Sequence, residues 1–318
     1  QGSLDTRMAD RHAFHRFHLI VLAVQSVGRK CHRMKVVRID HVYKDYQLGE
    51  QKVQALKDIT LAFDPGVFLA IAGPSGSGKT TLLNLIGCID TPSSGKIYIN
   101  EKDVSGRTPN QLADLRARTI GFIFQTFNLL PVLSAAENVE YPLLHRRDMS
   151  VAERRERVAY FLDIVGLAKF ASHRPNQLSG GQRQRVAIAR ALVIKPAIVL
   201  ADEPTANLDH KTGEEILLLM KRINRKLKTT FIFSTHDRRV IAKADRLVRV
   251  EDGEIALLGK RSSGKWSLAR HRPTEAVVDE PASALANEEP AVNDDEKQDS
   301  APIEAPDSNG ENRNADQK

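Results

Sequence analysis

The sequence predicts an α/β fold in which helices cover both faces of a parallel sheet. Three short apolar runs, at residues 68–73, 197–204 and 229–237, have the composition of buried strands. Helical patterns such as residues 78–89 and 211–227 alternate with them along the chain. Strands that alternate with helices build a parallel sheet, because each crossover places a helix on one of its faces.

Other segments surround these core strands. Residues 126–195 carry helical periodicity with little sign of a strand, so we expect an all-helical insert there. Residues 245–258 predict a hairpin with Asp252 and Gly253 at its turn. Apolar and polar residues alternate, and so predict half-buried strands, at residues 36–46, 53–63 and 96–104.

The two ends of the chain differ in composition from residues 34–260, which we expect to form the folded domain. Residues 1–33 precede Met34, and we expect this leader to be extraneous or loosely ordered. Its apolar run at 19–24 resembles the core of a signal peptide only faintly, because it is short and no clear cleavage site follows. Residues 261–318 hold few large apolar side chains, which predicts an acidic disordered tail.

The charge of the chain is unevenly distributed. The net charge is +7, although residues 274–318 alone carry 13 acidic and 3 basic side chains. The remaining basic body suits nucleic acid, a membrane surface or phosphate ligands, and charge does not choose among them. No apolar run approaches the roughly 20 residues that span a bilayer, so a role at a membrane requires a partner. The two cysteines, Cys31 and Cys88, form no disulfide framework and fit a reducing compartment.

A phosphate-binding loop follows the first buried strand. Residues 73–80, GPSGSGKT, match the pattern G-x-x-x-x-G-K-[ST] between a strand and a helix. Glycines allow backbone N–H groups to wrap a phosphate, Lys79 reaches the β- and γ-phosphates, and the Thr80 hydroxyl is a ligand for Mg²⁺. We therefore expect a nucleotide to be bound by Gly73, Pro74, Ser75, Gly76, Ser77, Gly78, Lys79, Thr80 and Thr81.

Two carboxylates end the second buried strand. Asp202 and Glu203 follow the apolar run AIVLA, and the carboxyl ends of parallel strands line the ligand crevice. We expect Asp202 to hold Mg²⁺ directly or through water. We expect Glu203 to accept a proton from the water that attacks the γ-phosphate. The alternative is a pair of solvated acids at a strand end.

A second glycine-rich turn, LSGGQ at residues 178–182, opens another helix. A helix N-terminus that follows such a turn attracts anions by the same physics as the first loop. One ATP has one γ-phosphate, and the first loop already holds it. We therefore expect Ser179, Gly180, Gly181 and Gln182 to contact the nucleotide of another copy of the chain, so that two chains enclose two ATP molecules. Ser179 as a helix cap is compatible with this role.

LSGGQ followed by a helix resembles the signature motif of ATP-binding-cassette (ABC) ATPases, and the resemblance spans residues 36–259. It implies a P-loop NTPase (RecA-like) core with an antiparallel β subdomain and an all-helical subdomain that carries the signature motif. It also implies roles for four residues. Tyr46 would stack on adenine, Gln125 would sense Mg²⁺ and couple to a membrane partner, Asp209 would lie in the loop that crosses the dimer interface, and His236 would contact the γ-phosphate.

Each of these residues has a simpler interpretation. Tyr46 could be a tyrosine on a strand surface, and Gln125 an exposed glutamine. Asp209 could cap the helix that begins near Lys211, alone or in addition to its interface role. His236 could be a histidine satisfied in the core. With these assignments the catalytic residues are Glu203, His236 and Gln125, and the metal ligands are Thr80, Gln125 and Asp202.

Longer runs resemble the lipoprotein-release and macrolide-export type of ABC ATPase. They are residues 82–100, 120–144 and 173–209. The resemblance implies a peripheral subunit at the cytoplasmic face of the inner membrane that powers a permease through its ATP-bound dimer. In two places, ANLD and FSTHD, the sequence departs from the usual pattern without losing a reacting group.

Three functions remain open at this point. The first is an ATPase subunit that drives export or lipoprotein release. The second is an ATPase that regulates a permease-like partner in cell-envelope or cell-division control without transport. The third, a soluble cassette acting on nucleic acid, is disfavoured because that class carries long coiled-coil insertions or tandem cassettes. We therefore expect a permease partner and no nucleic acid, with residues 131–139 forming part of an apolar groove for the permease.

Overall fold

The computed structural model describes residues 34–146 and 148–270. The predicted leader at 1–33 and the acidic tail from 271 onward lie outside the described residues. The chain divides into two compact units, residues 1–277 and 278–318, and every described residue belongs to the first.

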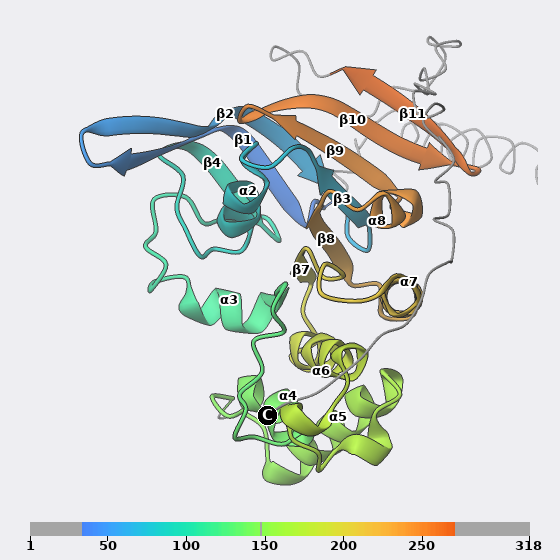
Figure 1. Cartoon of the computed structure of the whole chain (residues 1–318). Helices are drawn as coiled ribbons and strands as arrows, with labels where there is room; N and C mark the ends of the chain where they lie inside the picture. Colours follow the sequence, from blue (N-terminus) through green and yellow to red (C-terminus); the bar gives the residue numbers. More distant parts are fainter. Residues whose placement is uncertain (1–33, 147, 271–318) are drawn as a thin grey trace, which may run out of the picture. The chain divides into compact units, whose positions relative to one another are not determined.

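A seven-stranded sheet forms the centre of this unit (Figure 1), with the strand order β11-β10-β9-β3-β8-β7-β6. The strands from β9 to β6 in that order run parallel, whereas β10 and β11 pair antiparallel at one edge. The strands are β3 (Phe68–Ala72), β6 (Ile120–Ile123), β7 (Ile198–Asp202), β8 (Thr230–Thr235), β9 (Arg246–Glu251), β10 (Glu254–Ser262) and β11 (Lys265–Arg270).

A second, antiparallel sheet has the order β2-β1-β4-β5. It contains β1 (Val37–Leu48), β2 (Gln51–Phe63), β4 (Ser94–Ile99) and the two-residue β5 (Lys102–Asp103). These are the segments in which apolar and polar residues alternate. The alternation follows from one face being buried, since Val37, Ile39 and Val42 point into the core along β1.

Helices α2 (Lys79–Ile86) and α7 (His210–Leu227) follow β3 and β7, as the sequence predicts. Among the described residues of 126–195 there is no strand, which matches the expected helical insert. That insert contains α4 (Ala135–Glu140), α5 (Val151–Ile164), α6 (Gly180–Leu192) and the short helices η1 (Tyr141–Leu143), η2 (Ala168–Phe170) and η3 (Pro175–Gln177). The remaining helices are α3 (Ala113–Thr119) and α8 (Arg238–Lys243).

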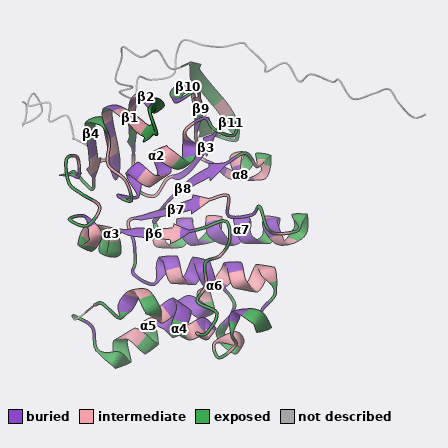
Figure 2. Ribbon diagram, turned by 60° about the vertical axis from the view of Figure 1, so that its left-hand side comes forward, coloured by how far each residue is buried: buried purple, intermediate pink, exposed green. Residues whose placement is uncertain are grey.

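Alternate residues of the central strands enter two different cores (Figure 2). Phe68 and Ala70 of β3 face the core formed with α6, α7 and the rest of the helical insert. Leu69 and Ile71 face the core formed with α2 and the antiparallel sheet. The prediction that helices cover both faces is therefore incomplete, because the antiparallel sheet covers much of one face. Burial on both faces explains why these strands are continuous apolar runs.

Four elements of the described residues were not predicted from the sequence, namely β6, α3, β11 and the short helix α8. Strand β6 is four residues long and contains Gly121, where a Cβ would lie 2.3 Å from the carbonyl oxygen of Ala191 in α6. Helix α3 contains no buried residue, so it lacks an apolar stripe. Strand β11 lies inside the segment that was expected to be disordered, and its pairing with β10 extends the folded part to Arg270.

No helix within 34–146 or 148–270 is long and apolar enough to cross a membrane.

Candidate functional site

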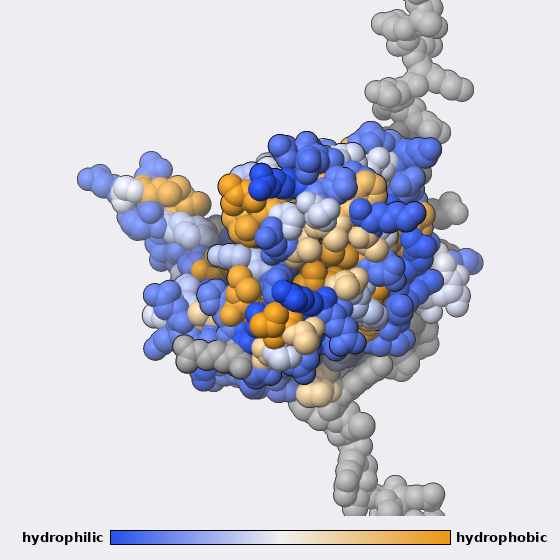
Figure 3. Space-filling model, turned by 90° about the horizontal axis from the view of Figure 1, so that it is seen from below, coloured by the Kyte–Doolittle hydropathy of each residue, from blue (hydrophilic) through white to orange (hydrophobic). Residues whose placement is uncertain are grey.

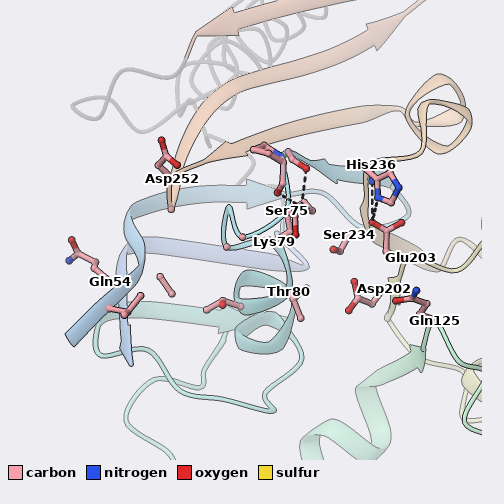
Figure 4. A pocket seen from close by; sticks show the side chains of 18 of the residues that line it. Gln54, Ser75, Lys79, Thr80, Gln125, Asp202, Glu203, Ser234, His236 and Asp252 are labelled. Carbon is pink, nitrogen blue, oxygen red and sulfur yellow. Dashed lines mark hydrogen bonds and ion pairs between the residues drawn. The ribbon is translucent and has the colours of Figure 1, made fainter. Parts of the chain in front are cut away.

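A cavity of about 930 Å³ lies where the carboxyl ends of several parallel strands meet. The N-terminus of α2 supplies Lys79 and Thr80 to its lining. Asp202 ends β7 and Glu203 follows it, and His236 follows β8. Figure 4 shows Lys79 and Thr80 on one side of the cavity and Asp202, Glu203 and Gln125 on the other. The structure thus brings together residues far apart in the chain, such as Lys79 and His236, as expected at the carboxyl ends of a parallel sheet.

The phosphate loop adopts a backbone that only glycine accommodates at two positions. Gly73 has φ of 152° and Gly78 has φ of 101°. A Cβ would lie 2.0 Å from the carbonyl oxygen of Val250 at the first position and 2.7 Å from that of Ala55 at the second. The loop therefore packs directly against the ends of neighbouring strands. This packing fixes the N-terminus of α2 beside the cavity.

The chemistry of this loop fits a phosphate. No side chain caps α2, and no acidic residue occupies its first turn. The first N–H groups of a helix lack internal partners, so they remain available to an anion. The Lys79 ammonium donates to the carbonyl oxygens of Gly73 and Pro74 at 2.9 and 2.6 Å, which keeps a positive charge at the loop. Ser77 is 3 % exposed and does not line the cavity, unlike the other loop residues predicted to bind a nucleotide.

Glu203 is held in place from several directions. Its Oε1 accepts hydrogen bonds from Nδ1 and the backbone N–H of His236, at 2.7 and 3.2 Å. Its Oε2 accepts from the Thr235 hydroxyl at 3.3 Å, and its own N–H donates to the Ser234 carbonyl at 2.9 Å. The residue has φ of 44°, an uncommon conformation for a residue with a side chain. Such strain persists only where the surroundings fix the residue, which is the case here.

The His236 ring is exposed, whereas the Glu203 carboxylate is mostly buried. The side chains are 78 % and 17 % exposed, respectively. Because a carboxylate is an acceptor, the hydrogen bond between them requires the proton on Nδ1 of His236. The opposite ring nitrogen then remains free for a ligand in the cavity. His236 is therefore not a satisfied core histidine.

The predicted metal ligands line the same cavity. The Thr80 hydroxyl, the Gln125 amide and the Asp202 carboxylate are hard oxygen donors, and Mg²⁺ prefers such donors. Within the described part of the chain, no three His, Cys, Asp or Glu residues cluster as a metal site. The donor set therefore fits a magnesium ion that shares its ligands with phosphate rather than an all-protein metal centre.

The second glycine-rich turn lies outside this cavity. Ser179 caps α6, accepting from the Gln182 N–H at 3.3 Å while the Gln182 amide oxygen accepts from the Ser179 N–H at 2.8 Å. Asp209 caps α7 and accepts from the Thr212 N–H at 2.9 Å. A Cβ on Gly181 would lie 2.6 Å from the Thr212 methyl group, so the two helix N-termini are neighbours. The capping roles are confirmed, and none of these residues lines the cavity.

Comparison with known proteins identifies the family. The model of the family described as ABC transporter matches residues 56–206. An uncharacterized ABC transporter ATP-binding protein of Methanocaldococcus jannaschii, MJ0796, is 47% identical over 223 residues, which are 69% of this chain and 95% of that protein. The chain belongs to the ABC transporter family. It is an ATPase cassette of that family, with ATP and Mg²⁺ as its ligands, as the sequence predicted.

Other relatives of this ABC cassette include the macrolide export ATP-binding/permease protein MacB of Syntrophobacter fumaroxidans. MacB is 48% identical over 223 residues, which are 70% of this chain and 31% of that longer protein. Among solved structures, a dimer of MJ0796 in a post-hydrolysis state with ADP and Pi gives a TM-score of 0.65 at 47% identity. That match covers 70% of this chain and 98% of the MJ0796 chain.

Tyr46 does not line the cavity of the cassette. Its hydroxyl donates to Asp90 at 2.7 Å, while Val53, its partner across the β1–β2 ladder, does line the cavity. Adenine stacking by Tyr46 stays a prediction. Sequence reasoning missed five lining residues at this end of the cavity, namely Val53, Gln54, Ala55, Asp252 and Gly253. Their only signals were the alternating strand pattern and the hairpin turn, neither of which indicates a ligand.

Proposed function

We propose that this chain is the ATP-hydrolysing subunit of an ABC exporter, which dimerises through ATP and powers a membrane permease. Its place would be the cytoplasmic face of the inner membrane. The observation that carries the proposal is that one chain presents two anion-binding surfaces that do not meet. One is the cavity at the phosphate loop, and the other is the exposed N-terminus of α6 at Ser179.

Two chains related by a twofold axis would satisfy both surfaces. In that arrangement Ser179 and the N–H groups at the start of α6 contact the γ-phosphate held by Lys79 of the partner. The dimeric structures of MJ0796 support this arrangement for a relative that is 47% identical. Neither surface alone encloses the triphosphate, which makes ATP a part of the interface.

Hydrolysis would then proceed within the closed dimer. His236 Nδ1 holds the Glu203 carboxylate. In the proposed dimer Glu203 would accept the proton of the attacking water, and the other ring nitrogen of His236 would contact the γ-phosphate. The helix N-terminus at α2 and Lys79 stabilise negative charge on the phosphates. A Mg²⁺ ion held by Thr80, Gln125 and Asp202 would supply further charge neutralisation.

An exposed apolar surface follows Gln125 and is suited to a membrane partner. The exposed apolar side chains near Gln125 and in the helical insert after it include Phe124, Leu130, Val132, Tyr141 and Leu144, of which Val132 is 73 % exposed. Figure 3 views the molecule from the side of α4 and α5 and shows hydrophobic side chains gathered among polar ones. Surfaces of this kind mark interaction sites. MacB joins an ATP-binding region to a permease in one protein, which supports a permease as the partner here.

A chimera tests the partner. Residues 34–270 replace the matching region of the Syntrophobacter fumaroxidans MacB protein, and macrolide resistance and ATP hydrolysis are measured in the chimera. Val132→Glu should abolish resistance and leave ATP binding within about twofold, because it buries a charge in the contact. Leu218→Glu, at an exposed leucine of α7, is the matched control and should preserve both. Loss of ATP binding in Val132→Glu, or unchanged resistance, would contradict the proposal.

A further inference from the structure

Helix α6 contacts the segments that follow Gln125 and Glu203 in its own chain, in addition to carrying the second glycine-rich turn. It lies between α7 and the pair α4 and α5 (Figure 1) and also contacts β6. Its residues from Val186 to Ala189 are completely buried, which holds the helix rigidly in the core. A rigid helix of 13 residues moves as one body, so a displacement at Ser179 is transmitted along its length.

Gln184 connects α6 to the catalytic carboxylate. The side chain is completely buried, and its Nε2 donates to the carbonyl oxygen of Pro204 at 2.7 Å. Pro204 directly follows Glu203. Among residues 34–146 and 148–270, no donor forms a hydrogen bond with the buried Gln184 Oε1. A buried amide that is only half satisfied costs stability, so folding alone does not explain a glutamine at this position.

Arg190 connects α6 to the segment that carries Gln125. Its guanidinium donates to the carbonyl oxygens of Phe127 and Asn128, at 2.8 and 2.5 Å. Both acceptor residues have positive φ, 59° and 49°, so this segment adopts an unfavourable conformation that the arginine holds. Burial lowers the pKa of Arg190 from its ordinary value, which is the cost of placing the guanidinium there. The segment begins two residues after Gln125.

We propose that Gln184 and Arg190 are positioning residues that link engagement of Ser179 to the placement of Glu203 and Gln125 in the same chain. The inference rests on the proposed ATP-bound dimer. When α6 docks on the partner's nucleotide, Gln184 sets the position of the Pro204 carbonyl and Arg190 sets the turn after Gln125. Closure at one nucleotide therefore prepares hydrolysis at the other. Neither side chain lines the cavity, so neither is a catalytic residue.

The test separates closure from hydrolysis. Gln184→Met keeps the length of the side chain and removes its donor, and Arg190→Lys keeps the charge and removes the paired donation to two carbonyls. Each variant is made in the wild-type chain for kcat and KM. Each is also combined with Glu203→Gln for ATP-dependent dimerisation by light scattering. Arg185→Lys is the matched control, since Arg185 also lies on α6 and donates to a backbone carbonyl, that of Val165 at 3.0 Å.

We expect the two variants to lose ATP hydrolysis while ATP-dependent dimerisation is retained. Both variants should lower kcat at least about tenfold, with KM for ATP and the ATP concentration that half-saturates dimerisation each changing less than about threefold. The Arg185→Lys control should match the parent in kcat, in KM and in the ATP concentration that half-saturates dimerisation. Thermal melting temperatures recorded for every variant identify a general loss of structure.

Two results would overturn the inference. One is an unchanged kcat in Gln184→Met and Arg190→Lys. The other is a parallel loss of kcat, dimerisation and melting temperature, which would assign both side chains to folding alone. Failure of the proposed function would give a different result. The Glu203→Gln parent itself would then stay monomeric with ATP, which would contradict both proposals.

Discussion

Gly78 shows at the scale of one residue how the fold and the site depend on each other. Its φ of 101° and its approach to the Ala55 carbonyl place the phosphate loop against β2. We predict that Gly78→Ala destabilises the fold by more than about 2 kcal/mol, since it adds a clash to the cost of a left-handed backbone. ATP binding should be lost with it. Urea unfolding and nucleotide titration measure the two effects.

Gly76 provides the control for that prediction. It also has positive φ, 78°, but a Cβ there would meet no atom within 4 Å. Gly76→Ala should therefore cost only about 1 kcal/mol of backbone strain. Equal destabilisation by the two substitutions would contradict the account, because the difference between them is the contact with Ala55.

Cys88 gives a prediction in pH. Burial raises the pKa of its thiol from the ordinary 9.0 to about 11, against a smaller opposite effect of Arg116. Between these pH values the unfolded chain loses the proton while the folded chain keeps it. The contribution of the thiol to stability is therefore complete below pH 9 and is lost as the pH rises to about 11.

The measurement compares the free energy of unfolding of Cys88→Ala and the parent, both with Cys31→Ser, at pH 8 and pH 10.5. A shift of two pKa units corresponds to about 2.7 kcal/mol, of which about 2 kcal/mol is lost by pH 10.5, so the parent should lose up to about 2 kcal/mol more than Cys88→Ala. A loss of the same size in the two chains would show that the thiol is not shielded.

At the scale of elements, Asp90 joins the antiparallel sheet to the end of α2. Lys44 and the Tyr46 hydroxyl, both on β1, donate to its two carboxylate oxygens at 2.7 Å. Burial opposes ionisation of Asp90, but the hydrogen bonds from Lys44, Tyr46 and the Thr91 N–H outweigh it and lower the pKa of the carboxyl. Lys44 is 8 % exposed and would lose its counter-charge without Asp90.

We predict that Asp90→Asn destabilises the fold by about 2 kcal/mol at pH 7, the cost of hydrogen bonds to charged groups. Because the folded pKa is lowered, this contribution is present above the ordinary pKa of 3.8 and is lost as the pH falls through the lowered value. The difference between parent and variant should therefore shrink in acid. A difference that is the same at pH 7 and pH 3 would contradict the role of the ionised carboxylate.

The elements that the sequence predicted share a physical property. Strands β3, β7 and β8 are buried on both faces, so they are continuous apolar runs, and α6 and α7 begin at Ser and Asp caps that are visible in the sequence. Strand β6 contains a glycine that its close packing against α6 requires, and β11 is mostly exposed. Neither segment therefore shows the apolar pattern of a strand in the sequence. Their existence follows from tertiary packing.

The sequence predicted the parts of the site that are local motifs and missed those that packing brings together. The phosphate loop and the Asp202–Glu203 pair are local motifs, and the structure places them on one cavity. Gln54 and Asp252 join that cavity only because the antiparallel sheet and the β9–β10 hairpin fold over it, and no motif records this. The contacts of Gln184 and Arg190 likewise arise from packing between elements distant in sequence.

At the scale of the whole molecule, the proposed function assigns the chain two half-sites for ATP, the cavity and the turn at Ser179. The cavity holds the catalytic groups, and the turn at Ser179 offers a second set of N–H donors that its own cavity does not use. The arrangement is complete only when a second copy is added. The proposed function therefore depends on dimerisation through ATP.

The most direct test is the oligomeric state of Glu203→Gln by light scattering, with and without ATP and Mg²⁺. Removing the base should retain ATP and trap two chains around two nucleotides, so the mass should double only when both ATP and Mg²⁺ are present. Adding Ser179→Arg, which places a bulky charge at the cap of α6, should restore the monomer while ATP binding persists. A chain that binds ATP and stays monomeric, or a dimer that forms equally well without ATP, would contradict the account.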